Sequence, residues 1–388
     1  MITDRLMSVG EWGLELVPNA PESARAAFDF GHNIFVTPTR FDRSVSFATL
    51  KTASVYAGLV FRIGGGRKRF GGPGLLGYLT TGKGEATDDV TSARPAGFGP
   101  VAYGAFLSAM VTARSLNGLT AGTGYSATAT TATVLSGAYG PPVKSILDTV
   151  AVATGNEYKV KPNGAIDYGV STSLFRSTPT VAVAPGLKGA DATLRVLEAT
   201  AWDVERNIDN YRNTATVYTN DGSYYNNSYS ASGVVFGRYG GAATYAAYSA
   251  TATVESNTHA EVDATVIAMA ALYTSPAMEI DCSVREYCIP RFVTPGDWIW
   301  VYSVDDGLTD TANQVVFNGQ TLFPKKVRCV GYSWPLEAGM GVYTYDTTGG
   351  TVTDVSDYVQ WETGKDTTLE LDSKPQSILD AGVRSVLL

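Results

Sequence analysis

Residues that could support catalysis are scarce in this chain of 388 residues, which contains only two histidines. His32 lies in a short apolar run that ends at a proline, so we expect it to have a packing or surface role. His259-Ala260-Glu261 has the His-x-Glu order of zinc deaminases, but those enzymes complete the metal site with Pro-Cys-x-x-Cys. Cys282 and Cys288 are instead separated by five residues. The sequence also contains no His-Glu-x-x-His zinc motif and no Gly-x-Ser-x-Gly nucleophile elbow.

Paired carboxylates offer another route to hydrolysis, because glycosidases bring two acids together in space. Asp305-Asp306 is the most visible pair, and it precedes Gly307 in a pattern typical of a turn. Asp88-Asp89 also lies in an expected loop. The run that starts at Asp305 lacks the terminal Glu of a calcium loop. We therefore predict a protein that is not an enzyme, with no catalytic, cofactor-binding or metal-binding residues and no cofactor.

The glycine-rich stretch from Gly64 to Gly84 has the spacing of a phosphate loop but not its chemistry. A P-loop requires Gly-x-x-x-x-Gly-Lys-Ser/Thr. Gly66 to Gly71 gives that spacing, but Gly72 and Pro73 stand where the lysine and the hydroxyl should be. No βαβ unit that would hold a dinucleotide is apparent. We expect a long loop, flexible or ordered by a partner, with Arg67-Lys68-Arg69 at its solvated tip.

Composition and charge narrow the class of protein further. The chain is 44% hydrophobic and only 17% charged, and its formal net charge is −8. Proteins that wrap nucleic acid need clustered Lys and Arg. The negative net charge of this chain is the opposite of that requirement. The 22 tyrosines outnumber the 14 phenylalanines, which fits both half-buried strands and interfaces.

Cysteine content and apolar runs indicate the compartment. The three cysteines, Cys282, Cys288 and Cys329, do not make a disulfide framework. We expect all three to be reduced and packed, and the chain to fold in a cytoplasm. The N-terminal residues do not resemble a secretory signal, and no apolar run approaches the ~20 residues that cross a bilayer.

Hydrophobic periodicity predicts a mainly β chain with a few helices. The expected strands are 11–17, 32–38 and 278–284, and 46–63 is expected to form two strands or one bulged strand. An amphipathic helix is predicted from Val143 to Ala151 and a capped helix from Val262 to Tyr273. A hairpin is predicted from Tyr158 to Tyr168 through Pro162-Asn163-Gly164. Residues 298–345 read as an antiparallel meander with turns at 305–307 and 318–319.

One strand of this meander raises a question about its surroundings. Trp298, Trp300 and Tyr302 alternate with Ile299 and Val301. Large aromatics on one face and aliphatics on the other imply that both faces are covered. Either both are covered inside one chain, or one face is an assembly surface.

These elements divide the chain into five segments. They are an N-terminal β segment (1–62), a Gly/Ala-rich loop insertion (63–140), a helix-hairpin and β segment (141–256), a helix with the meander (257–346) and a C-terminal arm (347–388).

Several of these segments together resemble a known family. The relevant stretches are "WGLELV" at 12–17, "VTPTRFD" at 36–42, "GPGLLGYL" at 72–79, "ILDTVAVATGNEYKVKPNGAIDYG" at 146–169, "ERNIDNYRNTATVYTNDG" at 205–222 and the run from Pro295 to Tyr343. In this order they resemble the minor tail proteins of long-tailed phages that infect actinobacteria. More distantly, they are similar to phage baseplate and tail-tip hub proteins, which share the Pro-Gly-Asp turn. The resemblance covers about residues 1–345 and leaves out the insertion at 223–256.

The resemblance implies tail-tube-like β-barrel or sandwich domains and a structural role in the virion. Hub proteins close the tail tube as trimers in which each subunit contributes two tube-like β domains. The implied partners are sister copies, the tail tube, distal tail and tape-measure proteins, and other minor tail proteins or fibres. DNA passes only in transit, which suits the acidic balance. The implied location is the tail tip of the virion, after assembly in the host bacterial cytoplasm.

Two alternatives to the hub role remain. One is a tail-associated hydrolase acting on the cell wall. The other is a receptor- or glycan-binding tail module, suggested by "GSYYNNSYSASG" at 222–233.

Overall fold

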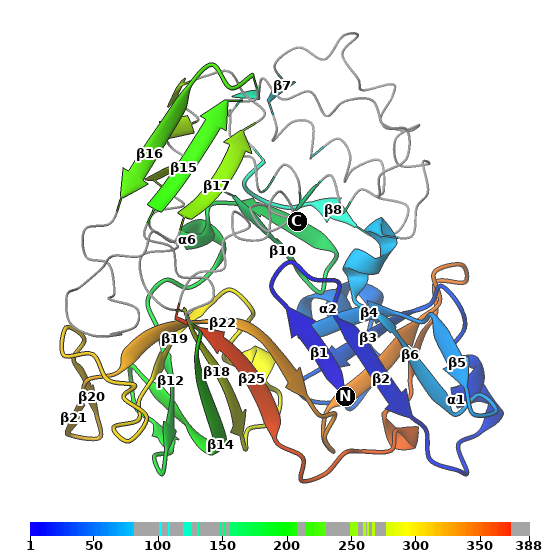
Figure 1. Cartoon of the computed structure of the whole chain (residues 1–388). Helices are drawn as coiled ribbons and strands as arrows, with labels where there is room; N and C mark the ends of the chain where they lie inside the picture. The colour runs from blue at the N-terminus through cyan, green and yellow to red at the C-terminus, as the bar shows by residue number, and fades with distance from the viewer. Residues whose placement is uncertain are drawn as a thin grey trace.

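The computed structural model of the chain describes residues 1–80, 101–102, 108, 119–125, 130–131, 144, 147–148, 151, 156–207, 214–219, 221–229, 249–254, 259–260, 262–263, 266–267 and 277–373. These residues form mainly strands, with a few short helices (Figure 1). The predicted β-rich class is therefore confirmed.

Six strands close into a barrel (Figure 1, lower left). They follow one another in the order β19 (Trp298–Val301), β12 (Val181–Pro185), β14 (Arg195–Asn207), β18 (Ala277–Val284), β25 (Thr367–Asp372) and β22 (Lys325–Trp334). Because β19 pairs with β22 as well as with β12, the sheet returns to its start. Closure leaves no free sheet edge along this circuit.

A second β unit continues from the same strand β22. Lys325–Arg328 of β22 pair with β19, whereas Gly331–Trp334 pair with β1. The sheet then runs through β1 (Ile2–Arg5), β2 (Glu11–Glu15), β6 (Arg69–Pro73) and β5 (Arg62–Gly64). A four-stranded sheet belongs to the same unit: β24 (Val352–Asp354), β23 (Gly341–Tyr345), β3 (Asn33–Thr37) and β4 (Tyr56–Leu59). One apolar core, which includes Trp12 and Trp334, extends through the barrel and this unit.

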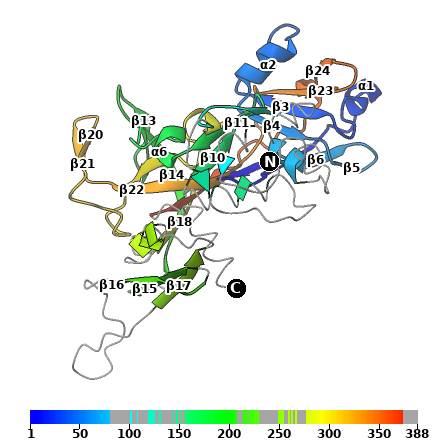
Figure 2. The same cartoon turned by 90° about the horizontal axis from the view of Figure 1, so that it is seen from above.

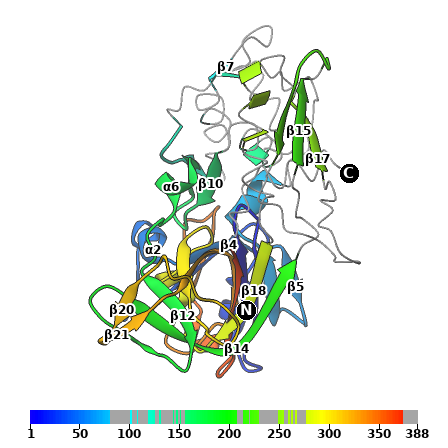
Figure 3. The same ribbon diagram turned by 60° about the vertical axis from the view of Figure 1, so that its left-hand side comes forward.

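The remaining strands form small sheets. They are β10 (Glu157–Val160) with β11 (Ala165–Gly169) and β8 (Thr120–Ala121); β16 (Tyr225–Tyr229) with β15 (Thr214–Thr219) and β17 (Ser249–Val254); β7 (Val101–Ala102) with β9 (Thr130–Thr131); β20 (Val315–Phe317) with β21 (Gln320–Leu322); and β13 (Gly189–Ala190) beside β14. The β15 sheet lies apart from the barrel (Figure 2, Figure 3).

The helices are short. They are α1 (Glu22–Ala26), α2 (Phe47–Ala53) and α6 (Ser171–Leu174), with 3-10 turns η1 (Leu75–Leu79), η3 (Ile289–Arg291) and η4 (Ser356–Tyr358). Within the part of the chain that the structure describes, no helix has the length and apolar character needed to cross a bilayer.

Several predicted elements are confirmed. Strands occupy most of 11–17, 32–38 and 278–284 as β2, β3 and β18. The Pro162-Asn163-Gly164 turn joins β10 to β11, and Tyr158 pairs with Tyr168. Asn318 and Gly319 join β20 to β21 with positive φ angles of 48° and 80°, as the primed two-residue hairpin turns require.

The stretch 46–63 differs from its prediction. It begins with helix α2 rather than a strand, because the Ser46 hydroxyl accepts a hydrogen bond from the Thr49 backbone N–H and caps the helix. Strand β4 follows, and β5 starts at Arg62.

The glycine-rich stretch is also ordered up to Thr80, as β6 and η1, rather than a long flexible loop. A side chain at Gly72 would overlap the Leu59 carbonyl, so this glycine serves close strand packing. Arg67 does lie at the exposed tip of the β5–β6 hairpin, with a positive φ of 60°. Residues 81–84 lie outside the described residues.

The meander from 298 to 345 was an incorrect prediction. Strands β22 and β23 belong to different sheets, and β20–β21 forms a separate hairpin. The C-terminal segment also differs from an arm, because β25 lies inside the barrel between β18 and β22. This pairing is non-local, and no local pattern reports it. Residues 374–388 lie outside the described residues, and the other segment boundaries stay predictions.

Both predicted helices are described only in part. Residues 144, 147, 148 and 151 are helical, and so are 259–260, 262–263 and 266–267. The other positions, including Met269 and Tyr273, lie outside the described residues.

Candidate functional site: a buried charged junction

The two histidines have structural surroundings. His32 places Nδ1 2.9 Å from the Ala27 carbonyl and Nε2 3.5 Å from an Asp346 oxygen. The His259 ring stacks on Tyr224, with 3.8 Å between the ring centroids. Neither arrangement provides a base beside a nucleophile.

The other sequence candidates are also dispersed. Asp305 and Asp306 lie in the turn between Ser303 and Leu308, and Asp306 accepts a hydrogen bond from the Ser303 hydroxyl. The predicted free, packed state of the three cysteines is confirmed, since all three are unpaired and buried. Across the described residues, no three His, Cys, Asp or Glu side chains gather in a way that could hold a metal ion. Asp88-Asp89 lies outside this part of the chain.

The most concentrated polar chemistry surrounds the Pro295-Gly296-Asp297 turn at the start of β19. The Asp297 carboxylate accepts hydrogen bonds from the backbone N–H and hydroxyl of Thr294, at 2.9 and 3.0 Å. It also accepts from the Arg176 backbone N–H at 2.9 Å and from Arg176 Nη2 at 2.8 Å. Only 4% of the Asp297 side chain is exposed. This carboxylate therefore joins the segment before β12 to the segment before β19.

Gly296 is required by both space and backbone geometry. Its φ angle is +102°, and a Cβ atom there would overlap the ring of Phe175. Its carbonyl accepts a hydrogen bond from Arg328 Nε at 2.9 Å. Glycine adopts this backbone conformation without the steric cost of a side chain.

A fully buried ion pair lies next to the turn. Arg328 on β22 donates two hydrogen bonds to the Glu157 carboxylate on β10, at 2.7 and 2.6 Å. The two side chains are 1% and 4% exposed. The guanidinium also lies 5.3 Å from the centroid of the Phe175 ring. Removing either partner of such a pair lowers the stability of the fold strongly, because the charge of the other partner stays buried.

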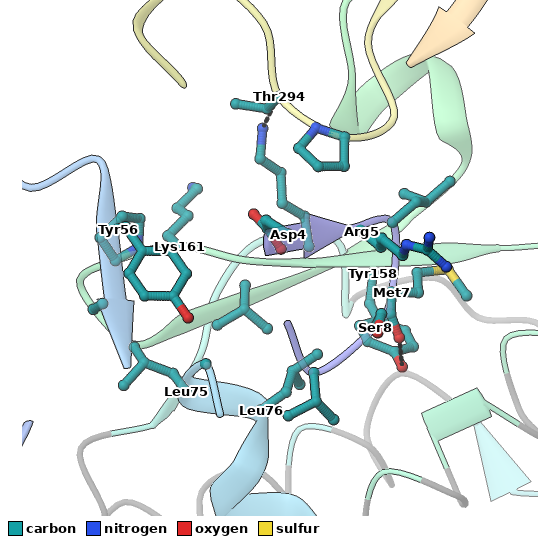
Figure 4. A pocket seen from close by; sticks show the side chains of 18 of the residues that line it. Asp4, Arg5, Met7, Ser8, Tyr56, Leu75, Leu76, Tyr158, Lys161 and Thr294 are labelled. Atoms are coloured by element: carbon teal, nitrogen blue, oxygen red, sulfur yellow. Dashed lines mark hydrogen bonds between the residues drawn. The ribbon is translucent and has the colours of Figure 1, made fainter. Parts of the chain in front are cut away.

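A cavity of about 120 Å³ lies beside the Pro-Gly-Asp turn, with Phe175, Thr294 and Pro295 among its lining residues (Figure 4). Lys159 crosses to it from β10 and donates a 2.9 Å hydrogen bond to the Thr294 hydroxyl. Burial lowers the pKa of Lys159, although the negative charge of Asp297 acts in the other direction. Asp4 on β1 also lines the cavity, and burial raises its pKa to about 6. The Lys159 charge opposes that rise.

The Tyr56 side chain also lines the cavity. The Tyr56 hydroxyl is buried and makes no hydrogen bond with the part of the chain that the structure describes. Burial raises the pKa of Tyr56 well above its usual value. The cavity is lined mainly by apolar side chains, but with Asp4 and Lys159 in its wall it has room and polar partners for a water molecule, which can satisfy such a hydroxyl.

Together these contacts form what we call the charged junction: Glu157, Lys159, Arg176, Asp297 and Arg328. It connects the β10–β11 hairpin to β22 of the barrel through Arg328 and to the turn before β19 through Thr294. Two ion pairs, Arg176–Asp297 and Arg328–Glu157, take up four of its five charges, and Lys159 donates to the Thr294 hydroxyl. The arrangement therefore suits a rigid connection. Sequence reasoning identified only the Pro-Gly-Asp turn, because Glu157 and Arg328 are 171 positions apart.

The two faces of the alternating strand at 298–302 are covered to different degrees by the chain itself. Ile299 and Val301 point into the core and are 1% and 0% exposed. On the other face, Trp300 and Tyr302 pack against an outer apolar cluster that includes Phe317 of the β20–β21 hairpin. The chain itself therefore buries the aliphatic face of this strand and covers the aromatic face only in part.

Comparisons with known proteins agree with this architecture. No known family profile matches the sequence, and no curated protein matches it either. Among solved structures, the tail protein from Neisseria meningitidis MC58 superposes with a TM-score of 0.50 at 12% identity, over 96% of this chain and 99% of that one. The 43 kDa tail protein of prophage MuSo2 from Shewanella oneidensis gives a TM-score of 0.53 at 10% identity, over 95% of this chain and 92% of that one. At these identities the likeness concerns the fold, which this chain shares with phage tail proteins over nearly its whole length.

Proposed function

We propose that this chain is a structural virion protein of a phage tail tip, where it forms a trimeric hub that closes the tail tube and anchors distal tail or receptor-binding components. The observation that carries the proposal is the pair of β units joined through the strand that they share, β22. Three copies place six such units around one axis, which suits the end of a tube built from rings of β domains.

The charged junction supports the same role. A hub transmits force between the tube and the distal parts, so its modules need fixed orientations. Buried, fully paired contacts such as Arg328–Glu157 provide orientation, because they have few alternative partners.

The expected partners follow from the proposed position. They are the tail tube, distal tail and tape-measure proteins on one side, and other minor tail proteins or fibres on the other. DNA is in contact only in transit, and the net charge of −8 suits a wall that does not retain phosphate. Assembly takes place in the host bacterial cytoplasm, and we expect an actinobacterial host.

Quantitative mass spectrometry of purified particles tests this proposal. The ratio of this chain to a tail protein of known copy number should correspond to three copies per particle. One copy per particle contradicts the trimeric hub. A parallel assay on cell-wall substrate addresses the hydrolase alternative, in which wild-type protein and Asp305→Asn/Asp306→Asn should be equally inactive.

A second candidate function is a receptor- or glycan-binding surface. Tyr218 and Tyr225 face each other across β15 and β16, with ring centroids 5.8 Å apart, and are 39% and 59% exposed. Exposed tyrosines combine an aromatic surface with a hydroxyl, which suits sugar binding. Wild-type protein should sediment with host envelope fractions, and Tyr218→Ala/Tyr225→Ala should not. Equal sedimentation of the two proteins contradicts this role.

A further inference from the structure

Exposed apolar side chains gather on the β20–β21 hairpin and the turn at its base. Val304, Val316 and Phe323 are 67%, 53% and 39% exposed. With Asp305 and Asp306 they make up what we call the arm surface. Apolar side chains concentrated on one projecting element are typical of a contact site.

The pairing within the hairpin explains why these side chains point outward. Phe317 and Leu322 are buried against the outer cluster on β12 and β14. Side chains alternate along a strand, so Val316, its partner Thr321 and Phe323 lie on the opposite face. The hairpin therefore covers its own barrel with one face and presents the other to solvent.

The arm surface is also acidic. Residues 303–324 contain Asp305, Asp306 and Asp310 but no Lys or Arg. The first two are exposed. A complementary surface must therefore supply both apolar area and positive charge.

Such a surface lies at the far end of the molecule. Phe30 and Phe61 are 67% and 39% exposed, and the side chains of Arg62 and Arg67 are 64% and 49% exposed. A hydrogen bond from the Gly31 N–H to the Val60 carbonyl (3.2 Å) brings the two phenylalanines together. We call Phe30, Phe61, Arg62 and Arg67 the aromatic–arginine surface. Aromatic residues and Arg are enriched where proteins bind one another.

Among the described residues, carboxylates do not engage these arginines closely. The nearest carboxylate oxygens are 3.8 Å away for Arg62, on Glu11, and 3.6 Å away for Arg67, on Asp29. Arg67 Nη2 also donates a 3.1 Å hydrogen bond to the Phe28 carbonyl. Both carboxylate distances are longer than the donor–acceptor distance of a good charge-assisted hydrogen bond. Solvent-exposed pairs of this kind are weak, so both guanidinium groups can bind an incoming carboxylate.

The two surfaces lie at opposite ends of the folded molecule (Figure 1, Figure 2). The arm surface is at β20–β21, and the aromatic–arginine surface is beside α1 and β5. They therefore cannot meet within one molecule. When a surface of one copy fits a different surface of the next, the contact repeats, and it closes a ring if the rotation allows.

We propose that the arm surface of one copy docks onto the aromatic–arginine surface of a second copy, and that this head-to-tail contact builds the ring. The inference rests on the proposed hub function and names the interface that the function requires. Contact between two arm surfaces would bring carboxylates together, and contact between two aromatic–arginine surfaces would bring guanidinium groups together. Both arrangements are disfavoured by like-charge repulsion.

Charge reversal in the full chain tests the contact. A phage lacking this gene product is complemented with variants, and incorporation into particles is measured by immunoblot. Asp305→Lys/Asp306→Lys should lower incorporation by about tenfold or more, and Arg62→Glu/Arg67→Glu should do the same. One chain carrying all four changes should regain incorporation. Because the surfaces are far apart in one molecule, such rescue reports an intermolecular contact and not recovered folding.

A matched control reverses two other exposed carboxylates. Asp203→Lys/Glu205→Lys changes the net charge by the same amount on the outer side of β14. This variant should be incorporated like wild type. Normal incorporation of the arm variant, or failure of the four-change chain to recover, overturns the proposal.

Thiol cross-linking in complemented particles gives a second readout. All three native cysteines are buried, so Val304→Cys/Phe61→Cys introduces the reactive thiols. A bis-maleimide should produce dimer and trimer bands. Val304→Cys/Val170→Cys, in which Val170 is also 55% exposed, should produce none.

The outcomes separate this inference from the hub function. Three copies per particle without specific cross-links refute the head-to-tail contact but leave the hub in place. A single copy per particle refutes both.

Discussion

Removing one partner of the Arg328–Glu157 pair should loosen the charged junction. In Glu157→Ala the guanidinium keeps, among the described residues, its hydrogen bond to the Gly296 carbonyl and its position near the Phe175 ring. Breaking a buried pair in this way typically costs 3–5 kcal/mol, since the remaining charge stays desolvated. With 1% and 4% exposure, we expect a loss of about 3 kcal/mol or more in the free energy of unfolding.

The double variant separates the ion pair from simple loss of packing. Glu157→Ala/Arg328→Met removes both charges and leaves an apolar side chain in their place. Replacement of a buried pair by apolar residues is often close to neutral. We therefore expect the double variant to be more stable than Glu157→Ala alone. The difference should be insensitive to salt, because a buried pair is screened little.

Urea denaturation combined with hydrogen exchange of the β10–β11 hairpin measures both effects. Exchange in residues 157–169 should accelerate in Glu157→Ala and partly recover in the double variant. If Glu157→Ala costs less than about 1 kcal/mol, or the double variant is less stable than the single one, the junction is not the rigid connection described above.

Three further predictions concern the same region. Gly296→Ala should destabilise the chain by about 2 kcal/mol or more, because the alanine would combine a positive φ with overlap of the Phe175 ring. Urea denaturation measures this loss. A variant as stable as wild type would contradict the prediction. The pKa of Asp4 is about 6 when folded, against an ordinary value of 3.8, so the folded state holds the proton more tightly and stability falls as the pH rises from about 4 to about 6. Relative to Asp4→Asn, wild type should lose about 1–3 kcal/mol across that window, and equal pH profiles for the two proteins contradict this assignment. Burial raises the pKa of Cys288 to about 12, so the three buried thiols should react with a maleimide only after unfolding, whereas rapid labelling of native protein contradicts their burial.

Local elements were predictable because their signals are local. The Pro162-Asn163-Gly164 and Asn318-Gly319 turns each specify a backbone geometry, and the strands on either side are next to the turn in sequence. Helix α2 was missed although Ser46 gives a capping signal, because the β-branched and aromatic residues of 46–63 favoured strands.

The long-range strand pairings of both β units were not predictable residue by residue. Ile2 pairs with Trp334, and β25 enters between β18 and β22 from the far end of the chain. Such pairings depend on which edges remain free after the rest has folded. The charged junction escaped detection for the same reason, since its five side chains come from four separate segments. Only the family resemblance, through the Pro-Gly-Asp turn, pointed to this region.

The most direct test of the account is a cryo-electron microscopy map of the tail tip in intact particles. The account predicts three copies of this chain around the tail axis, with six β units closing the tube and each β20–β21 hairpin against the α1–β5 end of the next copy. A single copy lying away from the axis would contradict it.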